Sequence, residues 1–128
     1  MLGMTGTSLS FALRGAKLRW AKLSEVPVIP NIHQTVYAAA AKESALDMGD
    51  WHNSCGTSHC RAGHVVHAAG EAGYQLEADI GTPNAALAIY HASDPEYFIR
   101  DGLPEFYDAT NAEALADMKR LADLEASQ

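Results

Sequence analysis

Apolar residues recur at helical spacing along most of the chain after its first 30 residues. A helix is predicted over 31–42, where apolar positions fall on one side and a run of alanines favours helix formation. A second helix is predicted to begin after Thr57 or Ser58, one of which is its N-cap, and to continue through 62–69. Beyond the first 30 residues, no pair of segments alternates in the manner of β-strands. The pattern therefore predicts a mainly α protein.

Cap signals predict three more helices. A threonine–proline pair and an aspartate–proline pair indicate a helix over 83–91 and a short helix after Pro95. The last helix is predicted to begin at Thr110, where Glu113 completes a capping box. Its buried side is predicted to consist of Leu115, Met118, Leu121 and Ala122. Together these signals predict a small single-domain helical bundle of about four to five helices over residues 26–128.

The segment before this bundle is a basic N-terminal arm, residues 1–25. Prolines at positions 27 and 30 favour an extended linker between the arm and the bundle. In the arm Leu13, Leu18 and Leu23 recur every five residues, which resembles the A-x-L-x-x pattern of pentapeptide-repeat proteins. Three copies do not complete a coil of that β-helix, so an extended or repeat-like arm is predicted. The alternative is an amphipathic helix with Leu9, Leu13, Ala16, Trp20 and Leu23 on one side.

The charged residues also differ between the N-terminal arm and the bundle. Residues 1–24 contain four basic and no acidic residues, whereas residues 25–128 contain five basic and all sixteen acidic residues, a balance of −11. Such an acidic body is not expected to bind nucleic acid directly, and it favours a host or competitor protein with a basic surface as partner. Solubility alone is the alternative explanation. The basic arm could also dock on the acidic body or on a neighbouring subunit, which predicts a possible homo-oligomer.

Composition argues against disorder and against a membrane span. Hydrophobic residues make up 48% of the chain, and no apolar run approaches the roughly 20 residues that a spanning helix needs. The N-terminal segment has no signal-peptide core, so a cytoplasmic protein is expected. In that reducing compartment the two cysteines are expected to serve as thiols, metal ligands or redox groups.

The candidate chemistry lies in residues 51–67, which contain both cysteines and four of the six histidines. Cys60, His64 and His67 share one face of the predicted second helix. With Cys55 from the preceding loop, these side chains form a two-sulfur, two-nitrogen donor set that suits zinc. Because helix positions 60 and 67 are about 10 Å apart, Cys60 and His67 cannot both bind one ion without distortion. A histidine outside this set then has to replace one of the ligands. The candidates for that substitution are His52 and His59.

Two other interpretations of this window remain open. Cys60 at the start of a helix, beside His59 or His64, has the position of an activated thiolate nucleophile. A disulfide between Cys55 and Cys60 is equally compatible with the spacing. Each interpretation that joins the two cysteines predicts that they lie close together and are mostly buried, with their sulfurs bonded or facing one ion. His64 is expected to be exposed, so that Cys60→Ser should destabilise the protein more than His64→Ala.

The window resembles a domain of phage and prophage proteins that often follows pentapeptide repeats. The resemblance covers roughly residues 26–124 and rests on the motif W-H-x-x-C-G-T-x-H-C-R-A-G. It implies common ancestry and no particular activity. The residues of this chain that match the pattern are Cys55, Thr57, Cys60, Ala62 and Gly63. Because a tryptophan often stands at the position of His64, the resemblance implies that His64 is not an essential ligand and that the motif is structural.

Two functional classes follow from these observations. The first is a phage-type accessory protein that binds and occludes the basic surface of a host protein, with inhibitors of bacterial immunity such as anti-CRISPR proteins as the leading subclass. The second is an enzyme or zinc-dependent hydrolase centred on Cys60. The missing acid–base constellation favours the first class. Its binding surface is expected to include acids that point away from the buried side of the last helix: Glu113, Asp117, Asp123 and Glu125.

Overall fold

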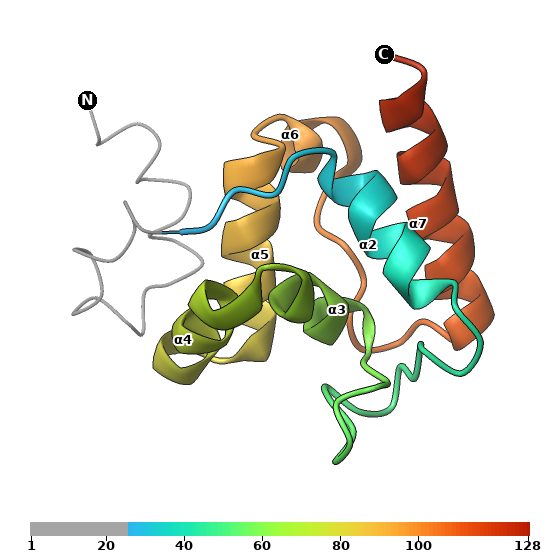
Figure 1. Cartoon of the computed structure of the whole chain (residues 1–128). Helices are drawn as coiled ribbons and strands as arrows, with labels where there is room; N and C mark the ends of the chain where they lie inside the picture. The colour runs from blue at the N-terminus through green and yellow to red at the C-terminus, as the bar shows by residue number, and fades with distance from the viewer. Residues whose placement is uncertain (1–25) are drawn as a thin grey trace.

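Six helices make up the regular structure of residues 26–128, the part of the chain that the computed structural model describes (Figure 1). They are α2 (Ile32–Ala40), α3 (Arg61–Ala68), α4 (Gly70–Ile80), α5 (Thr82–Ser93), α6 (Tyr97–Asp101) and α7 (Asn111–Ala126). Over these residues no strand forms, and the β-bridges are isolated ones. The predicted mainly α fold is therefore confirmed, whereas the predicted repeat-like arm lies outside the described residues.

The predicted helices are present, and α4 is a helix that the sequence pattern did not indicate. Glycines at positions 70 and 73 lower the intrinsic helix propensity of this segment by roughly 1 kcal/mol each, which explains why it was missed. No helix among residues 26–128 has the length and apolar character needed to span a membrane.

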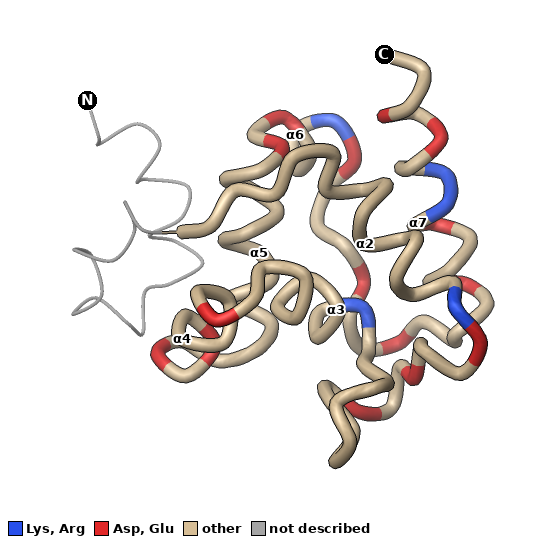
Figure 2. Tube along the Cα trace, in the orientation of Figure 1, with Lys and Arg blue, Asp and Glu red and all other residues tan. Residues whose placement is uncertain are grey.

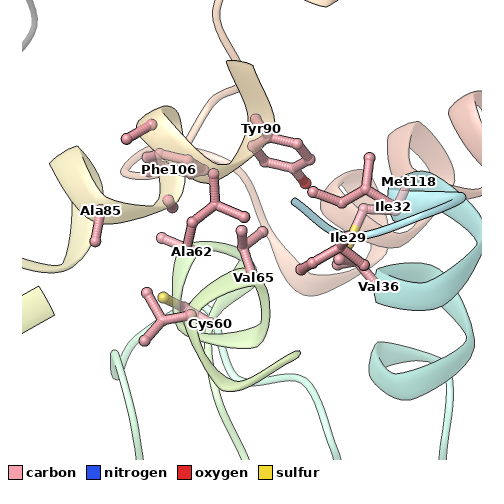
Figure 3. Close-up of a cluster of buried hydrophobic side chains, with 14 of the residues drawn as sticks. Ile29, Ile32, Val36, Cys60, Ala62, Val65, Ala85, Tyr90, Phe106 and Met118 are labelled. Carbon is pink, nitrogen blue, oxygen red and sulfur yellow. The ribbon is translucent and has the colours of Figure 1, made fainter. Parts of the chain in front are cut away.

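Helix α3 lies at the centre of the fold and packs against α2, α4 and α5. Six of its eight residues are buried. Figure 3 shows Ala62 and Val65 of α3 between side chains of α5 and side chains of α2. On α5 the buried positions facing this core are mostly small: Ala85, Ala86 and Ala88 with Ile89. Small side chains let the two helix backbones approach closely.

Two glycines of the α3 region are required by close contacts. A Cβ atom at Gly63 would lie 1.9 Å from the carbonyl oxygen of Trp51, which belongs to the loop before α3. A Cβ atom at Gly73 would lie 2.3 Å from the carbonyl oxygen of Val66, where α4 crosses α3. Both distances are far below van der Waals contact. The two glycines therefore determine how closely the loop and α4 pack on the central helix.

Helix α2 receives its N-terminal cap from the other end of the chain. Asn31, at the N-cap position, has a left-handed backbone and makes no side-chain cap. The carboxylate of Glu125 on α7 accepts hydrogen bonds from the backbone N–H groups of His33 (3.3 Å) and Gln34 (2.8 Å) instead. A negative charge at this position satisfies free N–H groups and interacts favourably with the helix dipole.

The prediction that the four acids of α7 point away from the buried side of the helix is therefore wrong for Asp117 and Glu125, which are half-buried against other parts of the fold. Glu125 caps α2. Asp117 pairs with the buried Arg61, and Glu113 completes the capping box with Thr110, which is confirmed. Asp123 is exposed and pairs with Lys119 on the same helix.

Several predicted boundaries also differ. The N-cap of α3 is Cys60, and neither Thr57 nor Ser58 caps it. Thr82 lies inside α5, whose N-cap is Gly81. On α7 the predicted buried residues Met118, Leu121 and Ala122 are buried, and Leu115 is partly buried.

Candidate functional site

The Cys/His window folds into a loop that is held to the rest of the protein through His59. The backbone N–H of His59 donates to the carbonyl of Ala45 (3.1 Å), and its carbonyl accepts from the N–H of Asp47 (3.0 Å). On its other side His59 forms an antiparallel bridge with His52. The loop therefore brings two histidines together directly before α3 begins.

Cys60 is a structural cap. Its Sγ accepts a hydrogen bond from the N–H of Gly63 (3.3 Å), and the residue is 1% exposed. Burial raises the pKa of the Cys60 thiol, although backbone N–H groups act in the opposite direction. Loss of hydration thus opposes the thiolate expected at this position, and Cys60 as a nucleophile stays a prediction that its burial does not support.

Cys55 lies apart in an exposed turn, and both cysteines are free thiols. The Oδ1 atom of Asn53 closes this turn by accepting from the N–H groups of Thr57 (2.9 Å) and Ser58 (3.2 Å). Gly56 occupies the turn with a φ of 71°, a left-handed conformation that glycine adopts without strain. The prediction that both cysteines are mostly buried, with their sulfurs bonded or facing one ion, is thus wrong for Cys55, since the turn holds it in solvent.

Four histidines converge beside the buried cysteine. The ring of His59 lies at the centre, with centroids 4.9 Å from His52, 4.9 Å from His64 and 4.5 Å from His67. His59 and His64 are buried, so the expectation that His64 is exposed is wrong. His67 is exposed, and its Nδ1 lies 2.8 Å from the hydroxyl of Tyr74 on α4. The structure thus brings together the histidines of the predicted site and leaves Cys55 outside it.

Hydrogen-bond partners assign the protons of two of these rings. The Nε2 atom of His64 lies 2.6 Å from the carbonyl of Ala45, and because a carbonyl can only accept, this nitrogen holds the proton. The Nδ1 atom of His64 is then a lone pair, and it is buried without a hydrogen-bond partner. His52 Nε2 lies 2.6 Å from the carboxylate of Glu77, which also accepts from the hydroxyl of Thr82 (2.7 Å).

The two buried histidines of the cluster, His59 and His64, are held uncharged at neutral pH. Burial and, to a smaller extent, the neighbouring histidines lower the pKa of His59 to about 4. Burial also lowers the pKa of His64. The contact between His52 Nδ1 and His59 Nδ1, 2.7 Å long, requires one proton between the two nitrogens. Protonating the cluster further would place positive charges side by side.

No three His, Cys, Asp or Glu side chains within residues 26–128 are grouped so as to hold a metal ion. In the predicted set of Cys55, Cys60, His64 and His67, one cysteine is in solvent and the other is engaged at a helix cap. Zinc binding therefore stays a prediction that the arrangement of these side chains does not support.

The residue after Cys60 anchors a second polar cluster, which the sequence pattern did not indicate. Arg61 is 1% exposed, and its guanidinium donates to Asp117 (2.8 Å), to the hydroxyl of Tyr97 (3.1 Å) and to that of Tyr90 (3.3 Å). Burial acts to lower the pKa of Arg61, but the two tyrosines and Asp117 hold it above its ordinary value. The signal that could have found this cluster is an arginine at the start of a helix whose following residues are small and apolar, because an arginine buried there needs polar partners.

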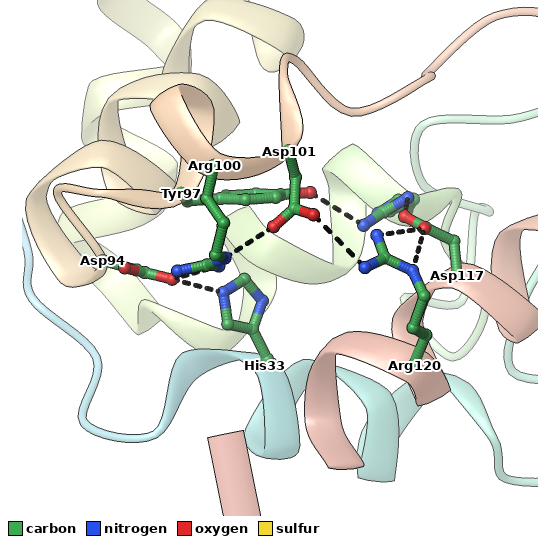
Figure 4. Close-up of polar contacts among 8 residues, drawn as sticks. His33, Asp94, Tyr97, Arg100, Asp101, Asp117 and Arg120 are labelled. Carbon is green, nitrogen blue, oxygen red and sulfur yellow. Dashed lines mark hydrogen bonds and ion pairs between the residues drawn. The ribbon is translucent and has the colours of Figure 1, made fainter. Parts of the chain in front are cut away.

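Ion pairs continue from this arginine across the surface, as Figure 4 shows. In order along the network the ion pairs are Asp117–Arg120 (2.8 Å), Arg120–Asp101 (3.2 Å), Asp101–Arg100 (2.7 Å) and Arg100–Asp94 (3.1 Å). Asp94 also makes a hydrogen bond with Nε2 of His33 (2.9 Å). These contacts tie α6 to α7 on one side and to α2 on the other. The short helix is therefore held in place by charge.

The segment that follows presents apolar side chains to solvent. We refer to residues 99–109, from α6 to the approach of α7, as the α6–α7 edge. Here Ile99 is 88% exposed, Leu103 is 67% exposed and Tyr107 is 69% exposed. Beside the edge is a pocket of about 260 Å³ that Leu103 lines. Its lining also includes four carboxylates and two guanidinium groups: Asp101, Glu105, Glu113, Asp117, Arg61 and Arg120.

Comparison with known proteins identifies no relative: no family model matches the chain, and neither a curated protein nor a solved structure matches it.

Proposed function

We propose that this protein acts by binding another protein, and that the α6–α7 edge is the surface that binds. The observation that carries the proposal is the exposure of Ile99, Leu103 and Tyr107 within nine consecutive residues. Exposed apolar side chains that cluster next to polar residues are typical of interaction sites. Because the network of ion pairs holds α6 in place, binding requires little ordering of this segment.

The charge around the edge favours a basic partner. The edge contains three acidic residues and one arginine, and residues 26–128 together contain fifteen acids against five bases. Figure 2 shows that the acidic residues lie on α4, α6, α7 and the connecting loops, while α2 and α5 carry no charged residue. A partner with Lys and Arg around an apolar patch would complement this surface.

Within this function we propose, as the finer assignment, that the partner is a nucleic-acid-binding protein of a host immune system. An acidic protein can occupy the surface that would otherwise bind phosphates. The resemblance of residues 51–63 to a phage domain supports this assignment, which makes the protein an inhibitor of the anti-CRISPR kind.

The test is a binding experiment on the partner that the protein retains from host lysate at low salt. The association rate of the purified partner is measured for the wild type, for Ile99→Ser/Leu103→Ser and for the control Val28→Ser. Val28 is also exposed, at 63%, but lies outside the edge. We expect the double variant to bind at least about tenfold more weakly, since two buried apolar side chains each contribute roughly 1.5–3 kcal/mol.

The same experiment includes salt and DNA. We expect association to slow steeply between about 0.05 and 0.5 M salt, and duplex DNA to displace the protein from its partner. The proposal is wrong if the double variant binds like the control, if association is independent of salt, or if DNA and the protein bind the partner together.

A further inference from the structure

The α6–α7 edge combines acidic and exposed apolar residues, and this composition is complementary to that of another part of the same chain. The pocket beside it is lined by four carboxylates, of which Asp101 and Asp117 are engaged by arginines. The carboxylate of Glu105 accepts from the backbone N–H groups of Tyr107 and Asp108 and has no cation among these contacts. The surface next to the exposed Leu103 can therefore attract a positively charged side chain.

The arm, residues 1–25, has the complementary composition. Its first 24 residues contain Arg14, Lys17, Arg19 and Lys22 and no acid. Apolar residues, among them Trp20, alternate with these cations. The arm thus combines the positive charge and the apolar side chains that we propose for a partner of the edge.

The arm also joins the body near the edge. The backbone N–H of Ile29 donates to the hydroxyl of Ser93, the last residue of α5 (2.9 Å). Helix α6, where the edge begins, starts four residues later in the chain. In Figure 1 the first described residues, drawn in blue, run past α5 toward α2. A segment of 25 residues spans up to about 80 Å when extended, so its length does not limit its reach.

We propose that the arm docks on the α6–α7 edge of its own chain and competes there with the basic partner. This inference rests on the proposed function, because it assigns a second, internal occupant to the same surface. An attached arm acts at high effective concentration, so a partner must displace it before binding. Only a partner whose affinity for the edge exceeds the effective affinity of the attached arm would then bind.

The test is hydrogen exchange of the full-length chain. The arm variant replaces Arg14, Lys17, Arg19 and Lys22 by serine, and the control is Lys42→Ser, which removes an exposed base outside the arm. We expect backbone amides of residues 98–109 to exchange several-fold faster in the arm variant than in the wild type or the control. The wild type in about 0.5 M salt should behave like the arm variant, since salt screens the attraction.

Equal exchange in the wild type and the arm variant would overturn the inference. Protection that grows with protein concentration would overturn it as well, because the arm would then dock on a second copy of the chain. Partner binding separates this result from the proposed function. The arm variant should bind the partner several-fold more tightly, whereas Ile99→Ser/Leu103→Ser should still bind weakly. If Ile99→Ser/Leu103→Ser weakens binding but the arm variant does not strengthen it, the inference fails and the proposed function stands.

Discussion

Arg61 is the residue on which the polar interior of the fold depends. It joins the first turn of α3 to α7 through Asp117 and to α5 and α6 through tyrosine hydroxyls. Burial also raises the pKa of Tyr97, so its hydroxyl remains protonated beside the guanidinium. Replacing this arginine lowers the stability of the fold, because its polar partners would be left without their hydrogen-bond donor.

We therefore expect Arg61→Ala to lower the free energy of unfolding by about 3 kcal/mol or more. Arg100→Ala removes a guanidinium that is well exposed, and should cost less than about 1 kcal/mol. Urea unfolding of the two variants measures the difference. Similar midpoints for both would contradict the assignment of Arg61 as a buried anchor.

The two cysteines should differ sharply in reactivity. Cys55 is exposed, whereas Cys60 is buried and burial raises its pKa. A thiol reagent such as Ellman's reagent should label Cys55 in the native protein and reach Cys60 after denaturation. Cys55→Ser provides the control, since it should abolish the native signal. Rapid native labelling of Cys60 would restore it as a candidate nucleophile.

At the scale of elements, α2 and α7 stabilise each other through one carboxylate. The C-terminal turns of α7 place Glu125 at the N-terminus of α2, where it replaces the cap that Asn31 does not provide. The two helices also pack together along their length. The start of α2 thus depends on a residue about ninety positions later in the chain.

Glu125→Ala should cost about 1–2 kcal/mol of stability, and Glu125→Gln should cost less because the amide oxygen can still accept. The matched control is Asp123→Ala, which removes an exposed carboxylate of the same helix and should change little. Thermal unfolding compares the three variants. A loss for Asp123→Ala as large as that for Glu125→Ala would rule out the capping role.

At the scale of the whole molecule, the histidine cluster links stability to pH. It joins the loop before α3 to α3 itself and, through Glu77 and Tyr74, to α4. The pKa of His59 is lowered in the folded state from 6.5 to about 4, and that of His64 is lowered as well. Between these pH values the unfolded chain therefore binds protons that the folded chain does not.

We expect the Tm to be constant above about pH 6.5 and to fall continuously as the pH decreases toward 4. The pKa values of the Asp94 and Asp117 carboxylates are lowered in the folded state, so protonating them reduces stability at still lower pH. His59→Gln should flatten the dependence, whereas His91→Gln, outside the cluster, should not. A wild-type Tm that stays level from pH 6.5 to pH 4 would contradict the lowered pKa values of the buried His59 and His64.

The sequence by itself determined the helical class, the start of α7 and the separation of charge along the chain. The capping box of Thr110 and Glu113 and the apolar spacing of α2 are readable because they depend on residues within one or two turns. The window of cysteines and histidines also located the cluster. It did not show which of its members meet, since Cys55 and Cys60 differ in exposure despite their short separation.

Only the tertiary structure decided the contacts between distant residues. Glu125 caps α2, Arg61 reaches Asp117, and His52 meets Glu77, over separations of 91, 56 and 25 residues. No local signal encodes these pairs, because the packing of whole helices determines which side chains become neighbours. The same packing left Ile99 and Leu103 in solvent, although their side chains are as apolar as those of the core. Hydrophobicity shows that a residue can be buried, and the arrangement of helices decides whether it is.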